Sequence, residues 1–198
     1  MRMKFSWIWV LILLANADFA RTTVGGPQEI RFLGYNEQER KVYWLTYFKD
    51  ASGRLPKLSY IDFSAEPFEP VVDTSWTKGI EPNDRRTFFK RVNAFKSQLL
   101  PLKQDMSDSL VVTARIIKIT DYIIANDLPS VKQFEMAIML KSGRLTGTSR
   151  ITSYINKRIG VSQWYRIPNE QYGIATFSCT GIPWEGGYFK DSVVVLKP

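Results

Sequence analysis

The residues best placed for covalent chemistry are Ser75 and Lys78, which stand three positions apart in the segment SWTK. This spacing is typical of penicillin-recognising enzymes, in which a lysine one helical turn after the serine takes up the proton of the serine hydroxyl. A Lys-Ser-Gly triplet, another element of such enzymes, follows at residues 141–143. The two segments together raise the hypothesis of an acyl-transferring serine enzyme.

The surrounding sequence argues against that hypothesis. Such a serine must begin a buried helix, but Gly79 follows Lys78 directly and Pro82 comes three residues later. The Ser-x-Asn element that should lie between the other two is missing from residues 79–140. The Ser142-Gly143 pair stands where a turn is expected after an alternating strand. We therefore interpret the match as accidental.

The composition removes most other catalytic chemistries. The chain contains no histidine, which excludes Ser-His-Asp and Cys-His catalysis and histidine-ligated zinc. Its one cysteine, Cys179, lies in an apolar, strand-like segment, where an inert buried thiol is expected. No aspartate-rich loop with the spacing of a calcium site is present. The sequence thus predicts no catalytic residue, no metal and no cofactor, and it favours a non-enzymatic domain.

Carboxylate pairs leave one enzymatic alternative open, a small glycan-active hydrolase. Glycoside cleavage needs only an acid and a base or nucleophile several ångströms apart. The candidate side chains are Glu66, Glu69, Asp73, Glu185 and Asp191. Their spacing along the sequence does not select one pair from among them.

The amino-terminal residues have the layout of a secretory signal peptide. A cationic start precedes an unbroken apolar run over residues 7–14, and residues 15–17 offer small side chains for cleavage. The apolar run is too short to cross a bilayer, which takes about 20 residues. We expect residues 1–17 to be a signal peptide, residues 18–27 a short leader, and the protein to be exported to the periplasm or the cell exterior. The single cysteine favours a bacterial envelope.

Beyond the leader, the pattern predicts an α+β protein. We expect a β-rich single domain over residues 28–198, with antiparallel meanders and one main amphipathic helix packed on the sheet. Three runs rich in aromatic and β-branched residues, separated by polar turns, predict a meander over residues 28–63. Further strand patterns occupy residues 110–120 and 134–140, and two closing strands follow in QYGIATFSC and DSVVVLK.

The helix is predicted over residues 84–99. Asn83 or Asp84 can cap its first amide groups, and Pro101 ends it. Apolar side chains recur at steps of three and four residues and form one stripe that should be buried against the sheet. The stripe consists of Phe88, Val92, Phe95 and Leu99.

Two groups of side chains are the candidate binding residues. Arg86 and Lys90 lie opposite the apolar stripe and could contact an anionic surface, although a solvated basic face fits the same pattern. Trp184 and Tyr188, before the last strand, could stack on sugar rings, although core packing explains such aromatic residues as well. With a net charge of +8, the expected partners are an envelope protein, an anionic polymer or a membrane surface, and nucleic acid is not expected.

A family resemblance rests on two segments, IRFLGYNEQERKVYWLTYFKDASGRLPKLSYIDF and IATFSCTGIPWEGGYFKDSVVVL. With a signal peptide before them and a basic helix between them, the chain resembles a family of bacterial predicted secreted proteins of unknown function. The first segment is also similar to a single blade of bacterial propeller repeats. WEGGY departs from the family's loop at several positions, and the resemblance implies no functional residue. The sequence as a whole predicts an exported, non-enzymatic binding or structural domain of the bacterial envelope.

Overall fold

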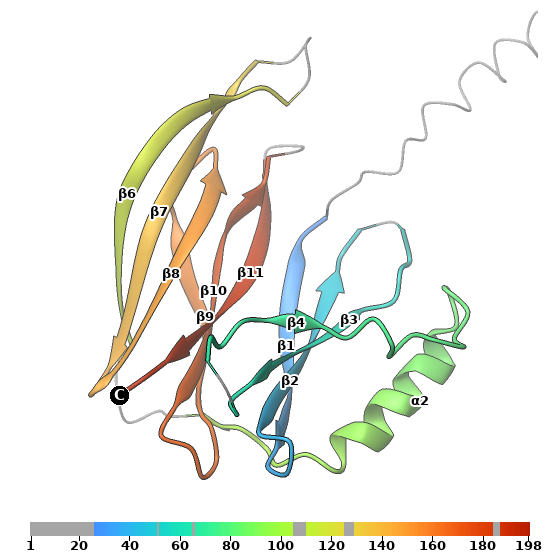
Figure 1. The fold of residues 1–198 in the computed structure, drawn as a ribbon. Helices are drawn as coiled ribbons and strands as arrows, with labels where there is room; N and C mark the ends of the chain where they lie inside the picture. Colours follow the sequence, from blue (N-terminus) through green and yellow to red (C-terminus); the bar gives the residue numbers. More distant parts are fainter. Residues whose placement is uncertain (1–25, 51, 65, 105–109, 125–128, 184–186) are drawn as a thin grey trace, which may run out of the picture.

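The computed structural model describes residues 26–50, 52–64, 66–104, 110–124, 129–183 and 187–198 and places them in two sheets and a helix (Figure 1). Sheet A has the strand order β4-β3-β2-β1-β11-β10-β9-β5, and sheet B the order β6-β7-β8. The strands are β1 Gln28–Asn36, β2 Lys41–Phe48, β3 Lys57–Asp62, β4 Val71–Val72, β5 Lys103–Gln104, β6 Val111–Tyr122, β7 Val131–Ser142, β8 Leu145–Tyr154, β9 Ile159–Arg166, β10 Gly173–Ile182 and β11 Tyr188–Leu196. The helix, α2, spans Arg85–Lys96. The β-rich α+β class is thus confirmed.

The first three strands form the predicted antiparallel meander, since β1 pairs with β2 and β2 with β3. Sheet A as a whole is nevertheless mixed, because β1 also runs parallel to β11, with Gln28 opposite Lys190. Asp191 reinforces this junction by accepting a hydrogen bond from the Ile30 backbone N–H at 3.0 Å. The prediction of antiparallel meanders is therefore confirmed only in part, because sheet A is mixed and pairs β1 with the distant strand β11.

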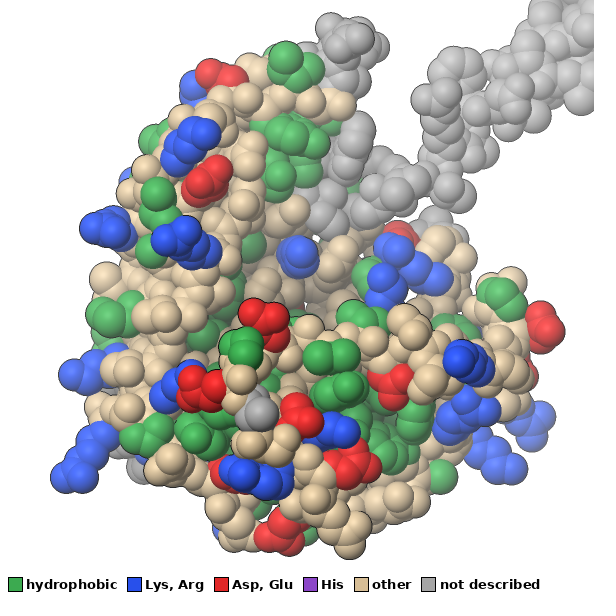
Figure 2. Space-filling model, in the orientation of Figure 1, with side chains coloured by type: hydrophobic (Ala, Val, Ile, Leu, Met, Phe, Trp, Pro, Cys, Tyr) green, Lys and Arg blue, Asp and Glu red, His purple; other side chains and the backbone are tan. Residues whose placement is uncertain are grey.

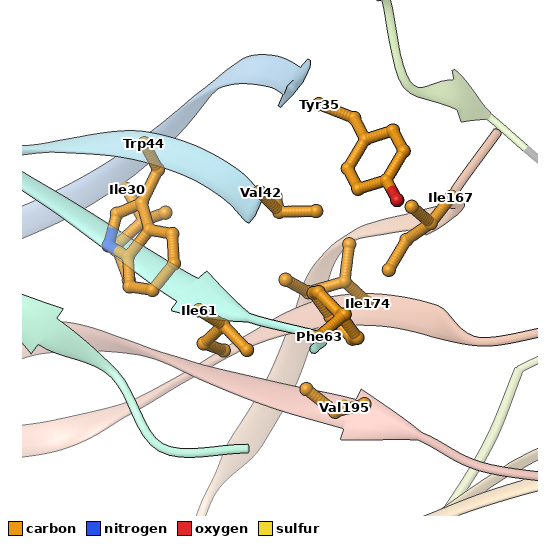
Figure 3. Packing of buried hydrophobic residues seen from close by; sticks show 9 residues of the cluster. All are labelled: Ile30, Tyr35, Val42, Trp44, Ile61, Phe63, Ile167, Ile174 and Val195. Carbon is orange, nitrogen blue, oxygen red and sulfur yellow. The ribbon is translucent and has the colours of Figure 1, made fainter. Parts of the chain in front are cut away.

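Sheet A curves so that its two halves pack face to face. Buried side chains from β1–β3, among them Val42 and Trp44, meet Ile174 of β10 and Val195 of β11 in one cluster (Figure 3). The period-two pattern of β2 explains this burial, because alternate side chains point to the same face of the sheet. The remaining alternate residues of β2 point to the opposite face, where the helix packs.

Sheet B packs against the half of sheet A formed by β9–β11. Ile138 and Leu140 of β7 join Phe177 of β10 and Leu196 of β11 in a second buried cluster. The two sheets are also joined by backbone hydrogen bonds. The N–H groups of Thr146 and Lys197 each donate to the carbonyl oxygen of the other residue, at 2.7 and 2.8 Å. In Figure 1, β6 and β7 extend beyond β9–β11, and β6 is exposed along most of its length.

Helix α2 covers the outer face of β2 and β3. Asp84 caps it by accepting a hydrogen bond from Thr87 N at 3.0 Å, which selects Asp84 over Asn83 as the cap. Phe88 and Val92 are buried against Leu45 and Leu58 in a third cluster, which confirms the predicted packing of the helix on the sheet. The helix ends at Lys96, so the predicted end at residue 99 is three residues too late.

Phe95 and Leu99 behave differently from the rest of the predicted apolar stripe. Leu99 is buried but lies beyond the end of α2. Phe95 is only half-buried, because it stands at the rim of α2 with open space beside it. The prediction that all four stripe residues are buried is therefore wrong for Phe95.

The predicted strands of the second half of the chain are present, together with three that the sequence did not indicate. β6, β7, β10 and β11 match the predicted segments, and Gly143 takes a left-handed conformation, φ 56°, in the expected turn between β7 and β8. β5, β8 and β9 were not predicted. Gly147 of β8 is buried so close to β11 that an added Cβ would lie 2.5 Å from the Val195 carbonyl oxygen.

A polar link fastens the two halves of sheet A to each other. Tyr35 at the end of β1 donates a hydrogen bond to Glu170, in the loop between β9 and β10. Arg40, in the turn after β1, donates to both carboxylate oxygens of Glu170 at 2.9 Å. Arg40 and Tyr35 lower the pKa of Glu170, and burial followed by the Glu170 hydrogen bond raises the pKa of Tyr35 to about 12.

The predicted signal peptide and all but the last two residues of the predicted leader lie outside the described residues. No helix in the described part of the chain has the length and apolar character needed to span a membrane. Cys179 is buried in β10, with its thiol 3.8 Å from the Thr152 carbonyl oxygen, and burial raises its pKa. These surroundings fit the inert thiol that the sequence predicts.

Candidate functional site

Ser75 lies in the turn between β4 and α2 rather than at the start of a helix. Its hydroxyl donates to Asp73 Oδ1 at 2.6 Å, and its backbone N–H donates to the same oxygen at 2.9 Å. The Lys78 backbone N–H donates a hydrogen bond to the Ser75 carbonyl oxygen at 3.1 Å, and the Lys78 side chain is exposed. Among the described residues no lysine amine contacts the Ser75 hydroxyl, so the arrangement lacks the base that a serine nucleophile needs.

We expect a fluorescent penicillin to leave the protein unlabelled, and Ser75→Ala to change the free energy of unfolding by less than about 1 kcal/mol, since Ser75 is exposed. Gel fluorescence after incubation with the penicillin, and urea unfolding of both proteins, would check this. Covalent labelling of the wild type that disappears in Ser75→Ala would show that Ser75 is a nucleophile after all.

The same turn forms one wall of a groove of about 490 Å³ between the outer face of β2–β3 and α2, which we call the Trp76 groove. Its volume falls within the usual range for ligand sites. The region between β3, β4 and α2 presents hydrophobic side chains next to acidic ones in Figure 2. The lining residues that matter most are Glu39, Tyr43, Tyr60, Asp73, Trp76 and Phe95.

Aromatic rings line the groove in a continuous series. Tyr43 of β2 lies directly opposite Tyr60 of β3, with ring centroids 5.6 Å apart. The Phe95 ring contacts both Tyr43 and Trp76, with centroid distances of 4.9 Å in each case. Tyr43 is buried, whereas Tyr60, Trp76 and Phe95 remain partly exposed and can offer ring faces to a ligand.

Trp76 is held in place by the helix. Arg91 of α2 donates a hydrogen bond to the Trp76 carbonyl oxygen at 2.6 Å and a longer one to the Lys78 carbonyl oxygen at 3.4 Å. The Trp76 indole N–H is buried and has no hydrogen-bond partner among the described residues. Buried donors of this kind are rare in folded proteins and call for an explanation, so Trp76 is the most unusual side chain of the groove.

The polar side of the groove carries Glu39, a carboxylate that already accepts two hydrogen bonds. Glu39 Oε2 accepts hydrogen bonds from the Tyr43 hydroxyl at 2.7 Å and from Lys41 Nζ at 3.0 Å. These two contacts, with Tyr43 first, hold the pKa of Glu39 below its usual value. The same contact contributes, after burial, to the raised pKa of Tyr43. Lys41 Nζ also lies 4.9 Å from the Tyr60 ring centroid, a cation–π contact.

The structure does not bring the predicted binding residues together. Arg86 and Lys90 are exposed on α2. Tyr188 is half-buried at the start of β11, which β1 separates from β2 and the helix-covered strands. Trp184 lies outside the described residues.

The candidate carboxylates are equally dispersed. Glu66 pairs with Lys197 at 2.8 Å, and Glu69 is exposed in the loop between β3 and β4. Asp191 is occupied by the Ile30 N–H and the Ser178 hydroxyl, both within sheet A. Asp73 alone of the described candidates lines the Trp76 groove, and Glu185 lies outside the described residues. Within the described part of the chain, no three cysteine, aspartate or glutamate residues are grouped as a metal site would require.

Most groove residues escaped prediction because they come from separate segments. Glu39 precedes β2, Tyr43 and Tyr60 belong to neighbouring strands, and Trp76 lies in the turn before α2. One available signal was the alternation in β2, which places Tyr43 and Leu45 on the face that the helix covers. The other was Trp76 itself, a large aromatic residue inside a turn.

Comparison with known proteins adds no family to this description: no family model, no curated protein and no solved structure matches the chain. The resemblance to bacterial predicted secreted proteins therefore stays a prediction. Function has to be inferred from the geometry of the chain's own residues.

Proposed function

We propose that this protein is an exported, non-enzymatic binding domain of the bacterial envelope and that the Trp76 groove holds a segment of a glycan chain. The layout of residues 1–17 supports export. One observation carries the binding proposal. Partly exposed aromatic rings and carboxylates converge in a single groove of suitable size.

A glycan matches both kinds of surface. One side of a sugar ring is a row of C–H groups, which packs against an aromatic face such as that of Trp76 or Tyr60. Its hydroxyl groups donate to carboxylates such as Glu39 and Asp73 and accept from Lys41. Ligand sites commonly combine apolar walls with a few convergent polar groups in this way.

Binding is favoured over glycan cleavage by the state of the carboxylates. A glycosidase needs one carboxylic acid that stays protonated near neutral pH, which requires a raised pKa. Glu39 has the opposite shift, because Tyr43 and Lys41 stabilise its charged form. Asp73 already accepts two hydrogen bonds from Ser75. The pair therefore suits hydrogen bonding to a ligand better than acid catalysis.

Titration with a hexamer of N-acetylglucosamine, followed by tryptophan fluorescence and calorimetry, tests the proposal. We expect saturable binding that Trp76→Ala weakens at least about five-fold, since loss of one stacking ring costs about 1–3 kcal/mol in the comparable case of bases on aromatic side chains. Tyr122→Ala is the matched control, because Tyr122 packs edge-to-face on Tyr154 in sheet B, away from the groove. Trp76→Phe should retain part of the affinity.

Two outcomes would contradict the proposal. Equal binding by Trp76→Ala and the wild type would place the glycan elsewhere, and absence of binding to both the hexamer and soluble peptidoglycan strands would remove the ligand class. Release of new reducing ends, abolished by Glu39→Gln or Asp73→Asn, would instead support the glycan-active hydrolase.

A further inference from the structure

The outer face of sheet B places two arginines on either side of an alanine. Arg115 of β6 lies opposite Ala137 of β7, and Ala137 lies opposite Arg150 of β8. Ile138 and Leu140 are buried against sheet A, so the alternate residues of β7, Ala137 among them, face outward. The three side chains therefore form one row across the exposed face.

The small side chain of Ala137 leaves a hollow of about 460 Å³ between the two arginines. The next row, Thr113, Met139 and Thr148, closes one side and contributes two hydroxyl groups. We call this the Arg115–Arg150 hollow and define it by Thr113, Arg115, Ala137, Met139, Thr148 and Arg150.

The charge around the hollow is unbalanced. Neither Arg115 nor Arg150 forms an ion pair with a described carboxylate, although Glu135 stands one row further along β7. Lys118, opposite Glu135, and Lys141 add positive charge on the same face. Lysine and arginine side chains line the left side of Figure 2, over β6–β8.

We propose that the Arg115–Arg150 hollow binds a phosphate group. The two arginines stand two strands apart, about 10 Å between their backbones, and each side chain can reach about halfway across. A carboxylate has only two oxygens and is satisfied by one guanidinium fork, whereas a tetrahedral phosphate offers oxygens to a fork on each side. The Thr113 and Thr148 hydroxyls are placed to donate to a remaining oxygen.

The phosphate can belong to a soluble compound or to a lipid headgroup. Two apolar side chains, Met139 in the hollow and Ile117 near Arg150, are 45% and 48% exposed. They would suit contact with the acyl chains of a lipid whose headgroup phosphate is bound in the hollow. The experiment therefore has two arms. One measures binding of inorganic phosphate by calorimetry, and the other measures co-sedimentation with phosphatidylcholine vesicles with and without phosphatidylglycerol.

The test compares Arg115→Gln/Arg150→Gln with Lys57→Gln/Lys103→Gln, two exposed lysines of sheet A that do not line the hollow. Both double variants remove two positive charges from exposed positions, and only the first alters the hollow. We expect the first to weaken binding at least ten-fold in whichever arm the wild type binds, with an unchanged melting temperature, and the second to bind like the wild type at matched salt. Arg115→Lys/Arg150→Lys, which keeps the charge and loses the forks, should bind more weakly than the wild type.

The soluble and the lipid source are distinguished by which arm shows binding, and either result supports the hollow. Failure to bind in both arms would overturn the proposal. Equal losses in the Arg115/Arg150 and Lys57/Lys103 variants would also overturn it, because the attraction would then come from net charge alone. Neither result bears on the Trp76 groove, whose glycan binding is measured separately.

Discussion

Phe88→Ala is expected to lower the free energy of unfolding by about 3–5 kcal/mol. Phe88 lies on α2 and is fully buried. It packs with Val92 against Leu45 and Leu58 of sheet A. Truncation removes a large apolar surface and leaves a cavity that the two packed layers cannot close. Urea unfolding of the variant and the wild type would measure the loss.

Phe95→Ala is the matched comparison on the same helix. Phe95 is half-buried at the rim of the Trp76 groove, so its loss should cost only about 1–2 kcal/mol. It should nevertheless weaken glycan binding, because Phe95 supports the Trp76 ring. Equal destabilisation by the two substitutions would show that the helix is seated differently from the arrangement described above.

Glu170→Gln is expected to destabilise the protein by about 2–3 kcal/mol at pH 7. The substitution removes the charge that receives two hydrogen bonds from Arg40 and one from the buried hydroxyl of Tyr35. The carboxylate is only 10% exposed, so water replaces these contacts poorly. Glu37 is the control, because it is exposed and accepts a hydrogen bond from Asn169, the residue next to Glu170. Glu37→Gln should change the free energy of unfolding by less than about 0.5 kcal/mol.

The effect of Glu170 should depend on pH in a defined direction. Because the folded protein lowers the pKa of Glu170 from its ordinary value of 4.5, the charged form is favoured in the folded state. The resulting stabilisation is complete above about pH 4.5 and is lost as the pH falls through the lowered pKa. The difference in melting temperature between Glu170→Gln and the wild type should therefore shrink on acidification. A difference that stays constant or grows toward acid would contradict the role assigned to the charge.

Local pattern was sufficient for the helix and for most strands. The spacing of Phe88 and Val92 marked the buried face of α2, and the pair Asn83 and Asp84 marked its start. β8 escaped prediction because LTGTSRITSY is rich in small polar residues. Its burial depends on Gly147 fitting against β11, a tertiary contact that the segment itself does not indicate.

The sites depend on register and on long-range pairing, which explains why they could not be predicted. Arg115 and Arg150 become neighbours only through the alignment of each with Ala137. The groove likewise needs β2, β3 and the Trp76 turn to meet under α2. The sequence pattern did indicate basic side chains as possible contacts for an anionic partner. It pointed to Arg86 and Lys90 of the helix, because a helical pattern is visible within a single segment.

The parallel pairing of β1 with β11 makes sheet A depend on two strands that lie far apart in the sequence. β11 stands inside the sheet order, between β1 and β10. Removal of β11 would therefore divide sheet A into the groups β4-β3-β2-β1 and β10-β9-β5, and it would take Asp191 away from the Ile30 amide. During synthesis β1 leaves the ribosome before β11, so it cannot pair with this neighbour until the intervening strands have been made. Completion of sheet A is thus a late event in folding, because it requires contacts between residues of high sequence separation.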